Sequence, residues 1–106
     1  MLFRSVIEHV DPGRLPALER VVFGFAAPST VVVTTPNAEY NPLYPNLGGS
    51  LRHPDHRFEW TRAEFGEWAE RVCAGYGYRV DHHGVGEPDE NAGAPTQLAV
   101  FTKETA

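Results

Sequence analysis

The run Thr-Val-Val-Val-Thr at residues 30–34 is the stretch that decides the predicted fold. Every side chain in it is β-branched, which favours extended backbone over helix. Its three valines also leave both faces of such a strand apolar. Strands buried on both faces are typical of the middle of a parallel sheet. We therefore expect residues 30–34 to form the buried central strand of a parallel sheet.

The segment upstream of this run predicts a strand followed by a helix. Residues 3–7 form a short apolar segment that is typical of the end of a strand. Asp11 can cap a helix, and Pro12 suits its first turn, where the missing N–H costs nothing. Apolar side chains then recur at helical spacing, which predicts an amphipathic helix over residues 14–25. These side chains are Leu15, Leu18, Val22 and Phe25.

Downstream, residues 35–60 form a long connection rich in proline, asparagine and glycine. Connections of this length are usually functional or disordered, and the aromatic and charged residues at its end favour function. Thr61 and Glu64 match a capping box, which predicts that a helix begins there. Gly75 or Gly77 can end this helix in a left-handed turn. Its expected buried face consists of Phe65, Trp68, Ala69 and Val72.

Two closing strands are expected at residues 78–81 and 98–102, joined by a loop over residues 84–95 that is rich in glycine, proline and acid. The predicted fold class is therefore α/β, with the chain order β-α-β-α-β-β. A sheet whose last two strands have no helix between them resembles the C-terminal half of a Rossmann-like class I methyltransferase sheet. Several α/β folds end in this way, so the order alone does not assign a function.

Composition predicts one small globular domain over residues 1–106. Hydrophobic residues make up 42% of the chain, which is too much for a disordered segment. The formal net charge of −5 provides no global basic field for nucleic acid, although Arg52, Arg57 and Arg62 could form a local patch. The single cysteine cannot form an intramolecular disulfide, and no apolar run is long enough to span a bilayer. A soluble, cytoplasmic protein without a membrane partner is the expectation.

Polar residues follow the predicted strands at the edge where ligands bind in open parallel sheets. Glu8 and His9 follow the first strand, residues 35–37 (Thr-Pro-Asn) follow the second, and the connection that carries His56 starts from the same edge. A carboxylate and two histidines from separate loops could converge on one divalent metal ion and leave positions open for a substrate. Alternatively, His56 is a surface histidine, Glu8 and His9 form a helix-entry pair, and Thr35 and Asn37 only shape a turn.

Five stretches carry a resemblance to a known family: residues 6–9 (Val-Ile-Glu-His), 31–42, 51–62, 84–88 (Gly-Val-Gly-Glu-Pro) and 95–97 (Pro-Thr-Gln). The stretch at 51–62 contains an Asp-His-x-Phe-Glu-Trp block, which is highly specific. Together these stretches resemble the small-RNA 3′-terminal ribose 2′-O-methyltransferases and cover nearly the whole chain. The resemblance implies a C-terminal half of the methyltransferase domain.

In that family a Glu-x-x-Glu-His motif and a later histidine of the Asp-His-x-Phe-Glu-Trp block hold a divalent metal, Mg²⁺ or Mn²⁺. The matching residues here are Glu8, His9 and His56, which the resemblance implies as metal ligands and catalytic residues. It further implies a metal that contacts the 2′- and 3′-hydroxyls of an RNA 3′ end, and S-adenosylmethionine as the methyl donor. Asn37 and Arg62 are expected to contact the RNA or to order a loop.

The chain departs from the family pattern in two respects. Ser5 stands where the motif has its first glutamate, so one metal ligand and one negative charge are lost. The family's S-adenosylmethionine site lies upstream of the matched segment, and residues 84–86 (Gly-Val-Gly) are a poor substitute because they open no helix. We therefore expect residues 1–106 to be a partial methyltransferase domain lacking the N-terminal cofactor-binding half, from a truncated protein or a fragment. Its partner would be that half or a second copy, docked on an exposed strand edge and an apolar face that includes Leu15 and Leu18.

The leading hypothesis is metal-dependent 2′-O-methylation of the 3′-terminal ribose of RNA, for small-RNA stabilisation or RNA repair. The alternative is a catalytically inactive remnant that binds RNA 3′ ends or a partner chain. A metal-dependent hydrolase with Glu8 as base is weaker, because no second catalytic group is evident.

The remaining residues with possible chemistry receive structural interpretations. His53, His82 and His83 are expected on the surface, and Trp60 and Trp68 in the core. Cys73 is expected to be an inert thiol beside the core. Tyr40 or Tyr44 could stack on a terminal base.

Overall fold

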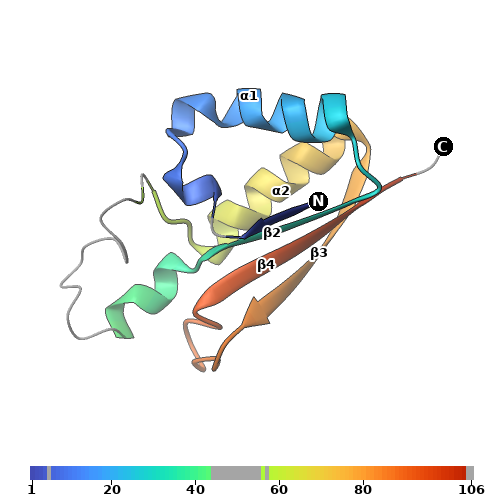
Figure 1. The fold of residues 1–106 in the computed structure, drawn as a ribbon. Coiled ribbons are helices and arrows are strands. Elements are labelled where there is room, and N and C mark those ends of the chain that lie inside the picture. Colours follow the sequence, from blue (N-terminus) through green and yellow to red (C-terminus); the bar gives the residue numbers. More distant parts are fainter. Residues whose placement is uncertain (5, 44–55, 57, 105–106) are drawn as a thin grey trace.

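The computed structural model describes residues 1–4, 6–43, 56 and 58–104. The predicted chain order β-α-β-α-β-β is confirmed, with short additional helices between the main elements (Figure 1). The elements are β1 (Leu2–Arg4), the 3₁₀ helices η1 (Ile7–His9) and η2 (Pro12–Arg14), α1 (Leu15–Glu19), the π-helix η3 (Arg20–Ala26), β2 (Thr30–Pro36), the 3₁₀ helix η4 (Ala38–Leu43), α2 (Arg62–Tyr76), β3 (Tyr78–Val85) and β4 (Thr96–Lys103).

The four strands form one mixed sheet in the order β1-β2-β4-β3. The run at 30–34 lies within β2, which is flanked on both sides, and its Val31 and Val33 are buried as expected. The sheet is not wholly parallel, however. β2 pairs parallel with β1 but antiparallel with β4, and β3 pairs antiparallel with β4. The reason is the short connection between β3 and β4, since parallel neighbours need a crossover long enough for a helix.

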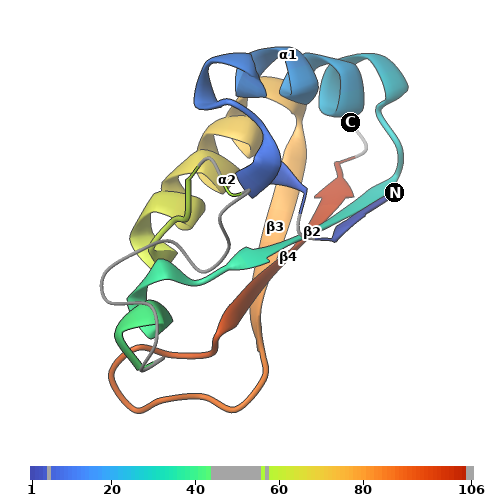
Figure 2. The same ribbon diagram turned by 60° about the vertical axis from the view of Figure 1, so that its left-hand side comes forward.

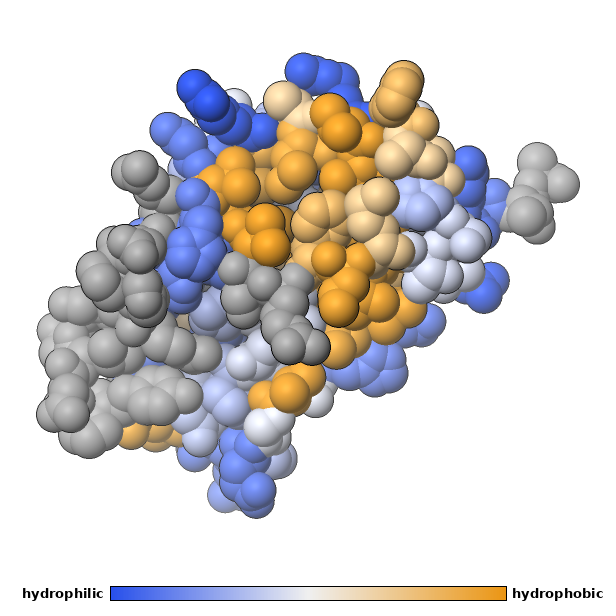
Figure 3. Space-filling model, in the orientation of Figure 1, coloured by the Kyte–Doolittle hydropathy of each residue, from blue (hydrophilic) through white to orange (hydrophobic). Residues whose placement is uncertain are grey.

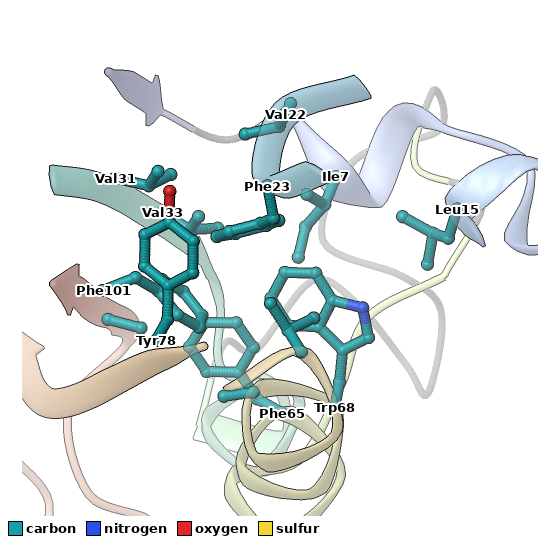
Figure 4. Packing of buried hydrophobic residues seen from close by; sticks show 13 residues of the cluster. Ile7, Leu15, Val22, Phe23, Val31, Val33, Phe65, Trp68, Tyr78 and Phe101 are labelled. Atoms are coloured by element: carbon teal, nitrogen blue, oxygen red, sulfur yellow. The ribbon is translucent and has the colours of Figure 1, made fainter. Parts of the chain in front are cut away.

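The helices pack on one face of this sheet, as the views in Figures 1 and 2 show. Between them and the sheet lies an aromatic core in which Phe23 has its ring centre 5.1 Å from that of Phe101 and 5.2 Å from that of Tyr78 (Figure 4). Trp68 packs against Phe101 as well, with their ring centres 5.9 Å apart. The buried apolar residues are Ile7, Leu15, Val22, Phe23, Val31, Val33, Phe65, Trp68, Ala69, Val72, Tyr78, Ala99 and Phe101.

Helix α2 begins and ends as its sequence predicts. Thr61 Oγ1 accepts from the backbone N–H of Glu64, and the Glu64 carboxylate accepts from the backbone N–H of Thr61, which completes the capping box. Gly77 ends the helix at φ +73°, a conformation that glycine adopts without steric cost. Its four predicted core residues are buried, so the expectation for this face is confirmed.

The first helical segment differs from the prediction of an α-helix over residues 14–25. The α-helix covers Leu15–Glu19 only, and the chain then widens into the π-helix η3 up to the left-handed Ala27. The wider turns shift the register after Arg20, because a π-turn contains more residues than an α-turn. Phe23 consequently occupies the core, whereas Phe25, which α-helical spacing assigned to the buried face, is 89% exposed.

An apolar face surrounds the free edge of β1. Met1, Leu2, Val21 and Phe25 are all more than half exposed. Figure 3 shows hydrophobic residues gathered over the side of the molecule where α1 and the sheet edge lie. The expectation that Leu15 and Leu18 lack packing partners is wrong, since Leu15 is buried and Leu18 packs against the core. Within the described part of the chain, no helix combines the length and apolar character needed to cross a membrane.

Candidate metal centre

Glu8 and His9 reach the site from a turn that directly follows β1. The segment is the 3₁₀ helix η1, and not the continuing strand predicted for residues 3–7. Its backbone is held by hydrogen bonds from the N–H of His9 to the carbonyl of Val6 (3.0 Å) and from the N–H of Val10 to the carbonyl of Ile7 (3.1 Å). The tight turn fixes both side chains at the edge of the sheet.

The Glu8 carboxylate is completely buried. Its Oε1 accepts a hydrogen bond of 3.2 Å from Thr35 Oγ1, on β2. Its Oε2 has no hydrogen-bond partner among the described residues. Burial raises the pKa of Glu8, and its own backbone N–H, Thr35, His56 and His9 offset this only in part. A buried carboxylate oxygen without a donor is costly, which is expected where a cation completes the environment.

His56 belongs to the long connection and lies in no helix or strand. Its ring lies edge-on to the ring of His9, with the ring centres 4.6 Å apart. Its Nδ1 lies in hydrogen-bond contact with Glu59 Oε2. The Glu59 side chain is fully buried and its other oxygen, Oε1, accepts a hydrogen bond of 2.5 Å from Asn41 Nδ2.

The ligand atoms of Glu8, His9 and His56 all lie within 4.8 Å of one another. The predicted convergence of these three residues is therefore seen in the structure, and the interpretation of Glu8 and His9 as a mere helix-entry pair does not account for it. Nitrogen and carboxylate ligands bind divalent ions at about 2.0–2.2 Å, so ligand atoms on one ion lie about 3–3.5 Å apart. Small side-chain rotations would bring all three around one ion. The donor set and the unpartnered Glu8 Oε2 fit a divalent metal with open coordination positions.

The two predicted substrate-binding residues, Asn37 and Arg62, are not among the three residues of the candidate metal centre. Asn37 is fully buried after β2, where its Nδ2 donates to the carbonyls of Ala92 (2.7 Å) and Ala94 (2.8 Å). Arg62, at the start of α2, donates from Nη2 to the carbonyl of Asn91 (2.9 Å). Both side chains therefore anchor the β3–β4 hairpin loop over residues 86–95.

Arg62 also forms a bidentate ion pair with Glu39, donating from Nε to Oε1 (2.9 Å) and from Nη2 to Oε2 (3.1 Å). Asn37 and Arg62 line a hollow of about 330 Å³ beside this loop, which none of the three candidate ligands lines. This hollow is also lined by His82 and His83, both exposed as expected.

Two further residues, for which no specific role was predicted, touch the candidate centre. Glu59 belongs to the Asp-His-x-Phe-Glu-Trp block, where its position three residues after His56 could have indicated the pairing. Thr35 was expected either at the ligand-binding edge of the sheet or in a turn, without a specific partner. It continues the alternation of β2, whose burial it shares. Ser5, His53, Tyr44, Arg52 and Arg57, which sequence analysis discussed, lie outside the described residues.

Two curated proteins named small RNA 2′-O-methyltransferase are similar to this chain. The mouse protein is 50% identical over 102 residues, which cover 93% of this chain and 25% of the relative. The Xenopus tropicalis protein is 48% identical over 102 residues, which cover 93% of this chain and 27% of the relative. The chain therefore spans about a quarter of the length of these curated relatives. No protein-family model matches the chain.

Two solved structures are also similar to this chain. The methyltransferase domain of a bacterial Hen1 is 52% identical with a TM-score of 0.84, covering 98% of this chain and 51% of that one. A chain in the Pnkp1/Rnl/Hen1 RNA repair complex is 28% identical with a TM-score of 0.77, covering 96% and 21%. In fold and sequence the chain is thus similar to a segment of these methyltransferase domains. More specifically, the chain is a homologue of the small RNA 2′-O-methyltransferases, which confirms the resemblance that the motifs indicated.

Proposed function

We propose that residues 1–106 bind the 3′-terminal ribose of an RNA and a divalent metal ion, Mg²⁺ or Mn²⁺, for 2′-O-methylation with S-adenosylmethionine. The observation that carries this proposal is the convergence of Glu8, His9 and His56, whose ligand atoms lie within 4.8 Å of one another. Homology to the small RNA 2′-O-methyltransferases supports the reaction and substrate class.

The buried carboxylate and two imidazoles would hold the ion and fix its orientation at the edge of the sheet. A divalent cation in this position lowers the pKa of a hydroxyl that contacts it. In the proposed reaction the terminal 2′-oxygen would attack the methyl group of S-adenosylmethionine. An O–CH₃ bond forms as the S–CH₃ bond breaks, S-adenosylhomocysteine leaves, and the hydroxyl proton passes to solvent. Glu8, His9 and His56 act by orienting the vicinal 2′- and 3′-hydroxyls, which a 3′-phosphate prevents. A free 3′ end is therefore required.

We assign residues 1–106 to the substrate and metal half of a methyltransferase domain. The cofactor is bound by a second half-domain that packs on the apolar face around β1, where Leu2 and Phe25 are 59% and 89% exposed. A free strand edge of this kind accepts a further strand. The bacterial methyltransferase domain, about half of which this chain covers, supports a division into two halves. A second copy of the chain is the other candidate for this face.

Asn37 and Arg62 contribute to the RNA site through the hairpin loop over residues 86–95. Their hydrogen bonds to the carbonyls of Ala92, Ala94 and Asn91 hold this loop against the start of α2. Ordering of the loop fixes the wall of the hollow that Arg62 lines, where the RNA would pass. The similarity to a chain of an RNA repair complex supports RNA ends as substrates in repair, besides small RNAs.

The test is methyl transfer from labelled S-adenosylmethionine to a short RNA by the full-length protein, with and without Mn²⁺. We expect Mn²⁺-dependent labelling of RNA that ends in a 2′,3′-diol. RNA with a terminal 2′-deoxyribose or 3′-phosphate should remain unlabelled, and His56→Ala should abolish labelling.

A matched control is His83→Ala, which removes an exposed histidine outside the centre and should leave Mn²⁺ binding unchanged. Metal-dependent labelling by His56→Ala would overturn the ligand assignment. RNA binding without labelling by the wild-type protein would favour the alternative, an inactive protein that binds RNA ends.

A further inference from the structure

Glu59 is the buried acid next to the candidate metal centre, and both of its oxygens have partners. Oε2 is in hydrogen-bond contact with His56 Nδ1 and Oε1 accepts from Asn41 Nδ2. The side chain is fully buried. The next residue, Trp60, bridges to Asn37 at the end of β2, and its carbonyl accepts from the N–H of Ala38 (2.9 Å). Glu59 is therefore held at a fixed position relative to the sheet.

His56 needs such support more than the other two candidate ligands. Glu8 and His9 lie in η1, whose backbone hydrogen bonds fix the direction of both side chains. His56 lies in neither a helix nor a strand, and it reaches the site from a connection far along the chain. The described contacts that orient its ring are the hydrogen bond to Glu59 and the edge contact with His9.

We propose that Glu59 is a positioning residue that fixes the tautomer and orientation of His56 for metal binding. This inference rests on the proposed function of the site. A carboxylate that accepts from Nδ1 keeps the ring proton on that nitrogen, so Nε2 carries the lone pair offered to the ion. Asn41 holds the opposite oxygen and thereby links the centre to η4.

The negative charge of Glu59 matters as well as its geometry. Among the described residues, Glu8 and Glu59 supply acidic groups at the three ligands, and their charges would balance much of the charge of a divalent ion. Loss of such an outer carboxylate typically weakens metal affinity by about 10–100-fold. Glu59→Gln keeps an acceptor oxygen and similar volume but removes the charge. Glu59→Ala removes both.

The first experiment measures Mn²⁺ binding by the full chain through the electron paramagnetic resonance signal of free Mn²⁺. We expect about 10-fold weaker binding for Glu59→Gln and close to 100-fold weaker binding for Glu59→Ala. The matched control is Glu70→Gln, the same substitution at an exposed position on α2, which should bind Mn²⁺ as the wild type does. Circular dichroism of each variant verifies the fold, and Glu59→Gln serves if Glu59→Ala does not fold.

The second experiment reads the His56 tautomer in metal-free protein from its ring ¹⁵N chemical shifts. We expect the proton on Nδ1 in the wild type and a mixture of tautomers in Glu59→Ala. A proton on Nε2 in the wild type, or Mn²⁺ affinities of both variants within twofold of the wild type, would overturn the assignment of Glu59. Failure of the wild type to bind Mn²⁺ would instead contradict the proposed function, because the tautomer is measured without metal.

Discussion

Thr35 donates a hydrogen bond to Glu8 across 27 positions of sequence, from Oγ1 to Oε1 at 3.2 Å. Both side chains are fully buried. One oxygen of the carboxylate is thus fixed by the sheet, whereas Oε2 is without a partner among the described residues. Strand β2 therefore contributes to the candidate site as well as to the core, because its carboxyl end orients Glu8.

Thr35→Val is expected to weaken both metal binding and the fold. Valine keeps the shape but leaves Glu8 Oε1 without its donor, and a buried acceptor that loses its partner costs about 1–3 kcal/mol. Urea unfolding measures the free energy, and titration with Mn²⁺ measures the affinity. Thr35→Ser, which retains the hydroxyl, is the control. Equal stability of all three proteins would show that this hydrogen bond does not hold Glu8.

Asn37→Ala tests whether Asn37 orders the hairpin loop. The substitution removes the donors to the carbonyls of Ala92 and Ala94, so the loop should open more often. Hydrogen exchange should accelerate at the amides of Asp89 and Gly93, which bond to each other's carbonyls across the loop. Asn91→Ala is the control, because the described contacts of Asn91 use its backbone. Unchanged exchange together with weaker RNA binding would favour a direct RNA contact instead.

Cys73 is expected to react slowly with alkylating reagents. Burial, with Glu70 and Glu104 nearby, raises the pKa of its thiol to about 11. The thiolate is the reactive form, so the native protein at pH 8 should react at least 10-fold more slowly than the urea-unfolded chain. Mass spectrometry after timed iodoacetamide treatment measures both rates. Comparable rates would contradict the interpretation of Cys73 as an inert thiol beside the core.

Glu19→Gln is expected to stabilise the fold, increasingly so as the pH rises above about 4.5. Burial raises the pKa of Glu19 in the folded protein, and Trp68, Arg71 and Arg20 offset this only in part. The folded state therefore binds more protons than the unfolded state in the window above the unfolded pKa, so its stability falls as the pH rises through that window. Glutamine has no such dependence. Urea unfolding of both proteins at pH 4 and pH 7 should show the larger difference at pH 7.

Local patterns predicted those parts of the fold that local chemistry determines. The valines of β2 and the Thr61–Glu64 capping box define their elements without help from distant residues. The π-helix could not be predicted in this way, because α-helical spacing assigned Phe25 to the core when Phe23 occupies it. Gly24 lies close to the Tyr76 ring, because a Cβ placed on Gly24 would be 3.1 Å from Tyr76 Cε1. Tyr76 belongs to α2, which is far away in the sequence, so local patterns could not predict this contact.

The candidate site also contains residues that could be predicted from the sequence and residues that could not. Its three ligand residues carry chemistry in their side chains and could be named from motifs. Thr35 acts through a tertiary contact that only the three-dimensional structure reveals. Glu59 contacts His56 from three positions away, a spacing that the sequence already contains. Asn37 was expected to contact the RNA or to order a loop, and its amide donates to two carbonyls of the hairpin loop.

The three candidate ligands come from two segments, the turn after β1 and the long connection, that are otherwise far apart in the chain. An ion bound between them would act as a reversible cross-link that closes a large loop. Closing this loop costs chain entropy, and that cost is coupled to binding of the ion. Metal concentration would then set the thermal stability of the protein. Removal of the ion would release His56 from its link to Glu8 and His9.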